Sequence, residues 1–225
     1  MSGAKWSKKV VETTADGSST IYLPELDEHY HSVKGALTES QYVFVDCGLS
    51  RCEKQRVRVL EIGFGTGLNA VLTSMSTGGR SVEYNTVELY PLSLAEVEAL
   101  GYFSMLPCDA AILLRRLHEA EWGVLSEITS EFSIRKIKCD MTGSCQEIPH
   151  CVDVVYFDAF APEKQPAMWT NEVFCRIYEA MNDGGVFVTY CAKGEVRRRL
   201  QSVGFMVERL PGPPGGKREI LRAVK

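Results

Sequence analysis

The chain has 225 residues, of which 45% are hydrophobic and 24% charged, and its formal net charge is −4. This composition excludes a disordered chain and is typical of a globular protein with one sizeable core. No apolar run approaches the roughly 18–20 residues that cross a bilayer, and the N-terminus has no apolar signal segment, so we expect a cytoplasmic protein without a membrane partner.

The first 56 residues follow neither a helical nor a strand period. Aromatic residues, acids and two histidines are mixed here, and His29 and His31 flank Tyr30. We interpret residues 1–56 as an N-terminal arm that packs on the active edge of the following domain. A shared site for the two histidines is conceivable, but surface or hydrogen-bonded histidines are the better interpretation.

Residues 57–225 form the second predicted unit, in which strand-like and helix-like segments alternate. Such alternation is typical of an α/β fold with a doubly wound, mostly parallel sheet. The predicted strands are 57–62, 81–89, 132–140, 152–158 and 184–191, followed by two final strands over 205–212 and 218–225. The predicted helices are one that follows the glycines of 63–67, then 92–100, 108–119, 171–181 and one that ends at Gly204.

A glycine-rich turn, "EIGFGTGLN", follows the first of these strands. Gly63, Gly65 and Gly67 allow close backbone approach to a ligand, and the helix that follows offers free N–H groups. The spacing differs from the G-x-G-x-x-G of dinucleotide sites. Glu61 before the turn would repel a pyrophosphate and suits a cationic ligand such as S-adenosylmethionine. A tight turn without a ligand remains an alternative.

Acidic residues end four of the predicted strands, namely Glu61, Glu88, Asp140 and Asp158. In doubly wound sheets, ligands bind at the carboxyl ends of the strands, and an acid roughly 20 residues past the glycines bonds ribose hydroxyls. Glu88 matches that position, and Asp140 could accept from an adenine amino group. An exposed acid at a strand end is the alternative for each.

Asp158 ends a strand next to the glycine-loop strand, in "YFDAFAPEKQPAMW". It should therefore face the reactive group of the ligand, where it can orient or deprotonate a substrate amine. Phe160 and Trp169 could stack on a flat base or shield the site. Packing against the core is the competing interpretation for both aromatic residues.

The eight cysteines are scattered and form no C-x-x-C pair, so we expect reduced thiols. The group Cys139, Cys145, His150 and Cys151 matches no zinc spacing, and we expect no metal. Residues 193–225 contain nine Lys or Arg and three Asp or Glu, which leaves −10 for the rest of the chain. This basic end could face a polyanion, or it could be an ordinary solvated surface.

Several of these strings together resemble a known family. "LEIGFGTGLNA", "VELYPLS", "YFDAFAPEKQPAMWT", "GGVFVTYCAKGEVRRRLQSVGF" and "KREIL" resemble the methyltransferase half of the bifunctional tRNA-modifying enzymes of the MnmC family. The similarity runs from about residue 20 to the C-terminus. It implies a class I Rossmann-like methyltransferase fold, with a mostly parallel seven-stranded sheet and a C-terminal antiparallel strand.

The resemblance also implies an activity, which is methyl transfer from S-adenosylmethionine to the aminomethyl nitrogen of a tRNA wobble uridine. The sequence departs from the family at "IKCD", where a Gly-Asp would be expected before the position of Asp140. It also lacks a fused oxidase half, so either another protein supplies the aminomethyl group or the substrate differs from that of the fused enzymes. The implied cofactor residues are Glu61, Gly63, Phe64, Gly65, Thr66, Gly67, Asn69, Glu88, Asp140 and Asp158. The implied substrate residues are Phe160, Pro162, Trp169, Lys217 and Arg218, with Asp158 as the catalytic residue.

Three other functions compete with the tRNA interpretation. The acceptor could be a small-molecule or protein amine, which the overall acidity favours. The chain could be a catalytically silent partner subunit, although it retains every acid on the predicted edge. A dinucleotide-dependent oxidoreductase is disfavoured by Glu61 and by the loop spacing.

Overall fold

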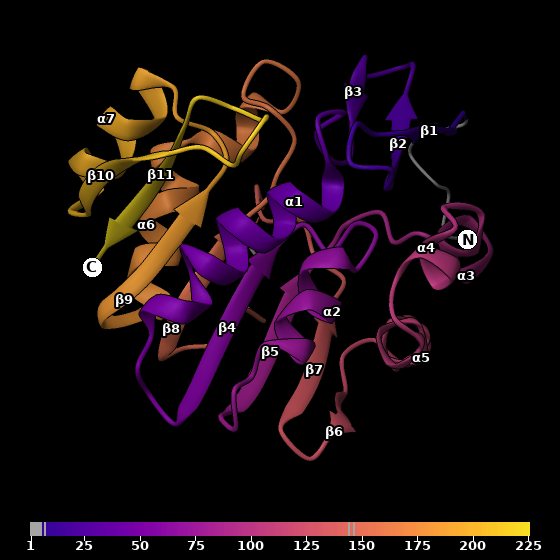
Figure 1. Cartoon of the computed structure of the whole chain (residues 1–225). Coiled ribbons are helices and arrows are strands. Elements are labelled where there is room, and N and C mark those ends of the chain that lie inside the picture. Colours follow the sequence, from indigo (N-terminus) through magenta and orange to yellow (C-terminus); the bar gives the residue numbers. More distant parts are fainter. Residues whose placement is uncertain (1–5, 7, 144, 146) are drawn as a thin grey trace.

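The computed structural model describes residues 6, 8–143, 145 and 147–225. It contains a large eight-stranded sheet with helices on both faces and a small three-stranded sheet near the N-terminus (Figure 1). In the part of the chain that the structure describes, no helix is long and apolar enough to cross a membrane.

The elements alternate from β4 onward, as the sequence predicts. The strands are β1 (Val10–Thr13), β2 (Ser19–Leu23), β3 (Glu28–His29), β4 (Arg56–Ile62), β5 (Ser81–Val87), β6 (Leu125–Thr129), β7 (Phe132–Ile137), β8 (Val152–Phe157), β9 (Met181–Thr189), β10 (Met206–Pro211) and β11 (Glu219–Val224). The helices are α1 (Ala36–Ser40), η1 (Gln41–Asp46), η2 (Leu49–Arg51), α2 (Leu68–Met75), α3 (Leu94–Ala99), α4 (Tyr102–Met105), α5 (Cys108–Glu119), η3 (Pro166–Trp169), α6 (Asn171–Ala180) and α7 (Gly194–Val203).

The large sheet has the strand order β10-β11-β9-β8-β4-β5-β7-β6. The five strands from β9 to β7 are parallel, and β11 pairs antiparallel with β9. The predicted α/β fold, with a doubly wound, mostly parallel sheet and a C-terminal antiparallel strand, is therefore confirmed. The sheet has eight strands rather than the predicted seven, because residues 125–129 form an antiparallel edge strand on β7. This strand was missed since its partly exposed "LSEIT" lacks a clear apolar alternation.

Two hydrophobic cores lie on opposite faces of the sheet because side chains alternate along each strand. In β4, Val57 and Val59 point to the core beneath α2 and α5, whereas Leu60 and Ile62 point to the core beneath α6 and α7. The central strand β8 is buried along its whole length. Because both faces of such a strand are covered, its sequence is apolar almost without interruption.

The N-terminal segment contains more regular structure than the sequence indicates. Strands β1, β2 and β3 form the antiparallel small sheet, which Figure 1 shows at the top of the view. The helical turns α1 and η1 follow, and Val43, Phe44 and Val45 of η1 are buried in the core on the α2 side. The periodicity was obscured because each element is short and buries only part of its surface.

Candidate active site

The carboxyl ends of the central strands are held in register by backbone hydrogen bonds that continue past the strands. The N–H of Gly63 donates to Val87 O at 2.9 Å, and that of Asp158 donates to Ile62 O at 3.0 Å. Glu88 likewise donates to Ile137 O at 3.0 Å. Two of the four predicted acidic residues, Glu88 and Asp158, are thereby fixed on one edge, at the point where the chain winds in opposite directions from β4.

The glycine loop between β4 and α2 takes backbone conformations that L side chains rarely adopt. Gly63 has φ +97°, and a Cβ there would lie 2.6 Å from the Asp158 carbonyl oxygen. Gly65 has φ +50°, and a Cβ there would lie 3.2 Å from the Tyr30 ring. The loop therefore requires glycine both for its backbone angles and for its close packing.

A first cavity opens in front of this loop. Glu88 lies in its wall, where Oε2 accepts from Gly65 N at 3.1 Å and Oε1 accepts from Tyr90 N at 2.8 Å. Burial raises the pKa of Glu88, and its backbone hydrogen bonds oppose that shift. The cavity is lined by Trp6, Tyr30, His31, Ile62, Gly63, Phe64, Gly65, Val87, Glu88, Leu89, Tyr90, Cys139, Asp140, Met141, Asp158, Ala159, Phe160, Gln165 and Met168.

A second cavity, with a volume of about 540 Å³, adjoins the first. Its wall includes the predicted substrate residues Phe160, Pro162 and Lys217, together with Glu39 and Tyr190. The residues that line both cavities are Tyr30, His31, Asp158, Ala159 and Phe160. Asp158 is thus the acidic residue that faces both spaces.

Asp158 is fixed and electrostatically perturbed. Its Oδ2 accepts from Asn69 Nδ2 at 2.9 Å. Burial and the nearby Glu39 carboxylate raise the pKa of Asp158 to about 7, while Asn69 and Lys217 act in the opposite direction. A carboxylate with a pKa near neutrality is suited to exchange protons with a substrate at physiological pH.

The N-terminal segment supplies two residues of the site that the sequence interpretation did not assign. His31 Nε2 lies 2.7 Å from Thr66 Oγ1 in the glycine loop, and burial lowers the pKa of His31 to about 4, so its ring is neutral. Tyr30 meets Phe160 edge-on, with ring centroids 5.3 Å apart. The sequence could not indicate these contacts, because the residues that meet are 35 or more positions apart in the chain.

Glu61 differs from its prediction, since it is fully buried and is not among the described residues that line either cavity. The alternation of side chains along β4 explains the difference. Glu61 lies two residues after Val59, so it points to the same face as Val59, beneath α2, and not toward the edge of the sheet. Thr86 Oγ1 donates to its Oε2 at 2.7 Å. Burial raises the pKa of Glu61 to about 8, so it is mostly protonated at neutral pH.

Three further cofactor residues that the family resemblance implies lie behind the loop instead of in the cavity wall. Thr66 is bonded to His31, and Gly67 is the N-terminal cap of α2 with φ +76°. Asn69 is buried, and its amide holds Asp158. These residues shape the loop and its carboxylate, while Gly63, Phe64 and Gly65 reach the cavity.

Trp169 also differs from its predicted substrate role. It is fully buried and packs edge-on against Phe157 and Phe174 in the core on the α6 side. Its Nε1 donates to Phe160 O at 2.8 Å, so it supports the loop that carries Phe160. The η3 turn directs the indole inward.

Arg218 also differs from its predicted substrate role. It is exposed on the β10–β11 connection and is not among the described residues lining the cavities.

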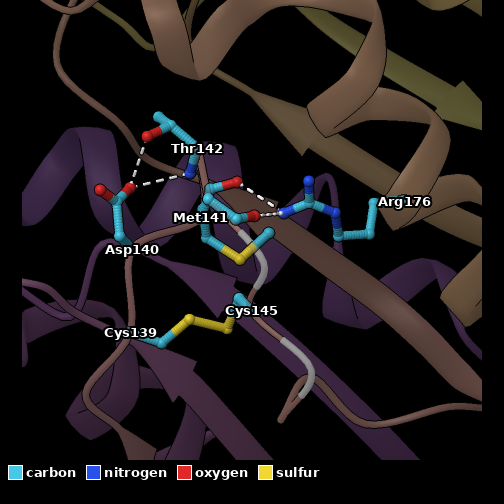
Figure 2. Close-up of a disulfide and its surroundings, with 7 residues drawn as sticks. Cys139, Asp140, Met141, Thr142, Cys145 and Arg176 are labelled. Atoms are coloured by element: carbon cyan, nitrogen blue, oxygen red, sulfur yellow. Dashed lines mark hydrogen bonds between the residues drawn. A yellow bond between two sulfur atoms is a disulfide. The ribbon is translucent and has the colours of Figure 1, made fainter.

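Asp140 lies in the loop after β7, since that strand ends at Ile137 rather than at residue 140. Its Oδ1 accepts from Thr142 N at 2.8 Å and from Thr142 Oγ1 at 2.7 Å (Figure 2). The neighbouring Cys139 forms a disulfide with Cys145, which corrects the expectation that all thiols are reduced. Both Cys139 and Asp140 line the first cavity.

The lining of the first cavity carries groups that suit a nucleoside with a cationic tail. The glycine backbone leaves room for close approach, Glu88 and Asp140 offer carboxylate acceptors, and Ile62, Val87 and Met168 supply apolar walls. These groups match the hydroxyl-bearing, aromatic and positively charged parts of S-adenosylmethionine.

Comparison with known proteins agrees with this geometry. Residues 115–225 match a family model described as S-adenosyl-L-methionine-dependent methyltransferase. The chain is 30% identical over 219 residues to the tRNA 5-methylaminomethyl-2-thiouridine biosynthesis bifunctional protein MnmC of Paraburkholderia phymatum, which covers 91% of this chain and 33% of that protein. The corresponding protein of Pseudomonas fluorescens is 31% identical over 211 residues, with 87% and 32% covered. The chain spans about a third of the length of these curated relatives.

Solved structures give the same picture. MNMC2 from Aquifex aeolicus superposes with a TM-score of 0.76 at 25% identity, covering 98% of this chain and 71% of that one. Spermidine synthase from Thermotoga maritima has a TM-score of 0.57 at 13% identity, covering 100% and 81%, and supports the fold alone.

Proposed function

We propose that this chain, which is similar to the S-adenosyl-L-methionine-dependent methyltransferase portion of the MnmC proteins, methylates the aminomethyl nitrogen of a tRNA wobble uridine. The product would be 5-methylaminomethyl-2-thiouridine, the nucleoside in the names of its bifunctional relatives. This substrate agrees with the cytoplasmic location that the sequence predicts.

One observation carries the proposal: two cavities of different character meet at Asp158. The first is bounded by the glycine loop and by Glu88, and it suits the cofactor. The second is wider and leads away from the loop, so it suits an acceptor. A group that enters the second cavity meets the first at the Asp158 carboxylate.

The chain's own residues would hold the cofactor at the first cavity. Gly63 and Gly65 would admit it against the backbone, Glu88 would accept from ribose hydroxyls, and Asp140 would accept from the base. When bound, S-adenosylmethionine supplies an electrophilic methyl group on a sulfonium. Tyr30 and His31 would enclose this cavity from the N-terminal side.

Asp158 would prepare the acceptor for reaction. An alkyl ammonium has a pKa of about 10 and must lose a proton before its nitrogen can attack. A carboxylate with a pKa of about 7 can accept that proton or hold the neutral amine through a hydrogen bond. Asn69 would keep the carboxylate in place, and most of the acceleration would come from positioning the two reactants.

The wider cavity supports a nucleotide as acceptor. Phe160 and Pro162 lie in its wall and offer flat surfaces to a base. Lys217 lies at the same cavity, and Arg218 is exposed beside it, where phosphates could be met.

A second candidate acceptor is a small-molecule amine. The observation that favours it is the acidity of the second cavity, whose wall contains Glu28, Glu39, Asp158 and Glu219. Carboxylates attract a compact cation and repel a polyanion. The basic residues of 193–225 argue for RNA, which we therefore place first.

The test is methyl transfer from labelled S-adenosylmethionine into bulk tRNA from cells that lack the wobble-uridine methyltransferase. We expect label in the methylaminomethyl nucleoside after digestion, and none with the Asp158→Ala protein. Failure to label tRNA, with cofactor binding intact by calorimetry, would contradict the tRNA proposal and favour another amine.

A further inference from the structure

Glu39 is a buried carboxylate in the acceptor cavity with an incompletely satisfied charge. It belongs to α1, only 6% of the residue is exposed, and it lies in the same cavity wall as Asp158. Its Oε2 is buried and makes no hydrogen bond among the described residues. Because a buried carboxylate is costly without a partner, this position calls for a cation.

The cation that faces Glu39 in the structure is the ammonium of Lys217. Lys217 Nζ lies 3.5 Å from Glu39 Oε2, which is longer than the roughly 2.7–2.9 Å of a charge-assisted hydrogen bond. The same ammonium lies 3.6 Å from the centroid of the Tyr190 ring. A carboxylate and an aromatic face are the two groups that together recognise an ammonium ion.

The two sides of this ammonium differ in rigidity. The Tyr190 hydroxyl donates to Ala159 O at 2.7 Å, which fixes the ring next to Asp158, and Glu39 is buried. Lys217 instead has 40% of its side chain exposed and comes from the connection between β10 and β11. Its ammonium can therefore leave for solvent while Glu39 and Tyr190 stay in place.

We propose that Glu39 and the Tyr190 ring form a cation subsite that receives the ammonium group of the acceptor, and that Lys217 occupies this subsite until the acceptor replaces it. The subsite rests on the proposed function, because it identifies the acceptor as a primary alkyl ammonium. It delivers that group beside Asp158, which then takes the proton. Glu39 and Tyr190 bind the cation, and Asp158 carries out the proton transfer.

The test compares two anticodon stem-loop RNAs that differ at the wobble base, one with 5-aminomethyl-2-thiouridine and one with 5-methyl-2-thiouridine. Their affinities for the full chain are measured by calorimetry with S-adenosylhomocysteine present, so no turnover occurs. We expect the amine RNA to bind the unmodified protein roughly tenfold more tightly. Glu39→Gln should remove this preference and leave the affinity for the methyl RNA unchanged.

Lys217→Met separates this proposal from a simple phosphate contact. If Lys217 fills the subsite, its removal should raise the affinity for the amine RNA and so increase the preference, because the ammonium of the acceptor no longer has to displace it. If it only contacts phosphate, both RNAs should lose affinity equally. Asp183→Asn is the matched control, because Asp183 has 98% of its side chain exposed, lies in the β9 strand and is not among the residues lining the two cavities of the candidate site.

Two results would overturn the subsite. One is an unchanged amine preference in Glu39→Gln, and the other is an equal loss of affinity for both RNAs, which indicates a structural role. A protein that methylates the amine RNA but binds both RNAs equally would overturn the subsite while the proposed function stands. Absence of methyl transfer to tRNA in the separate labelling test would overturn the proposed function itself.

Discussion

At the scale of single residues, burial decides the protonation of the acids in and just after the central strands. Asp158 faces two cavities and has a pKa of about 7, whereas Glu61 is enclosed and has a pKa of about 8. Desolvation is the largest cause in both, because it disfavours the charged form. The two carboxyl groups therefore differ in access to a substrate, not only in acidity.

Asp158→Asn should lower kcat by about 10²- to 10⁴-fold, the usual contribution of a positioned proton acceptor. The affinity for S-adenosylmethionine should change little, because the amide retains the shape of the carboxylate. In the unmodified enzyme, kcat/KM should rise with pH through about 7 as Asp158 ionises. Steady-state kinetics and calorimetry check this. A variant that loses cofactor affinity with no further loss of turnover would contradict the assignment.

Glu61 gives a prediction about stability. The folded pKa is raised to about 8, so above about pH 4.5 the unfolded chain releases a proton that the folded chain keeps. The free energy of unfolding therefore falls as pH rises from about 4.5 to 8, by at most about 1.4 kcal/mol per pH unit for this group. Glu61→Gln lacks this loss, so denaturant unfolding should show its stability relative to the unmodified protein rising across that range. A pH-independent difference would show that Glu61 is ionised in the fold.

At the scale of elements, the backbone conformation of the glycine loop determines both the stability of the loop and the shape of the first cavity. Gly63→Ala should cost about 1–3 kcal/mol of stability and abolish cofactor binding, because its Cβ would collide with the Asp158 carbonyl at φ +97°. Gly78→Ala is the matched control: Gly78 has φ +61° with no atom within 4 Å of an added Cβ. It should lose stability but keep cofactor affinity by calorimetry. Equal affinities for the two variants would refute the close-approach argument.

The loop after β7 is closed by a disulfide where it lines the first cavity. Cys139 in the cavity wall is joined to Cys145, and Arg176 of α6 holds Met141 O at 2.8 Å (Figure 2). Reduction frees one end of this loop, so a reductant should weaken S-adenosylmethionine binding severalfold. Cys145→Ser should bind as weakly as the reduced protein and should not respond to reductant. An unchanged affinity on reduction would separate the disulfide from the cofactor cavity.

The sequence predicts elements better than it predicts cavity walls. The strand at 57–62 and the helix at 108–119 are found close to their predicted bounds because their apolar patterns are strong. Glu61 and Trp169 could not be placed from the string alone, since their orientation depends on strand parity and on the η3 turn. Tyr30 and Glu39 required knowledge of which distant segments meet.

At the scale of the whole molecule, charge is divided between an acidic body and a basic C-terminal end. If that end meets RNA phosphates, tRNA affinity should fall steeply between 50 and 200 mM salt. Replacing exposed Arg198 or Arg218 by alanine should each reduce the salt slope by about 1 in a binding titration. Arg51→Ala, near the opposite ends of the strands, is the control and should leave the slope unchanged. A salt-independent affinity would favour a small-molecule acceptor.

The mass of a single defined product tests the proposed methyl transfer directly. An anticodon stem-loop with 5-aminomethyl-2-thiouridine is incubated with the protein and S-adenosylmethionine, and its nucleosides are analysed by mass spectrometry. The proposed activity implies one added methyl group on the aminomethyl nitrogen, formed at least about 10²-fold more slowly by Asp158→Asn. An unmodified RNA, or a methyl group at another atom, with cofactor bound would contradict it.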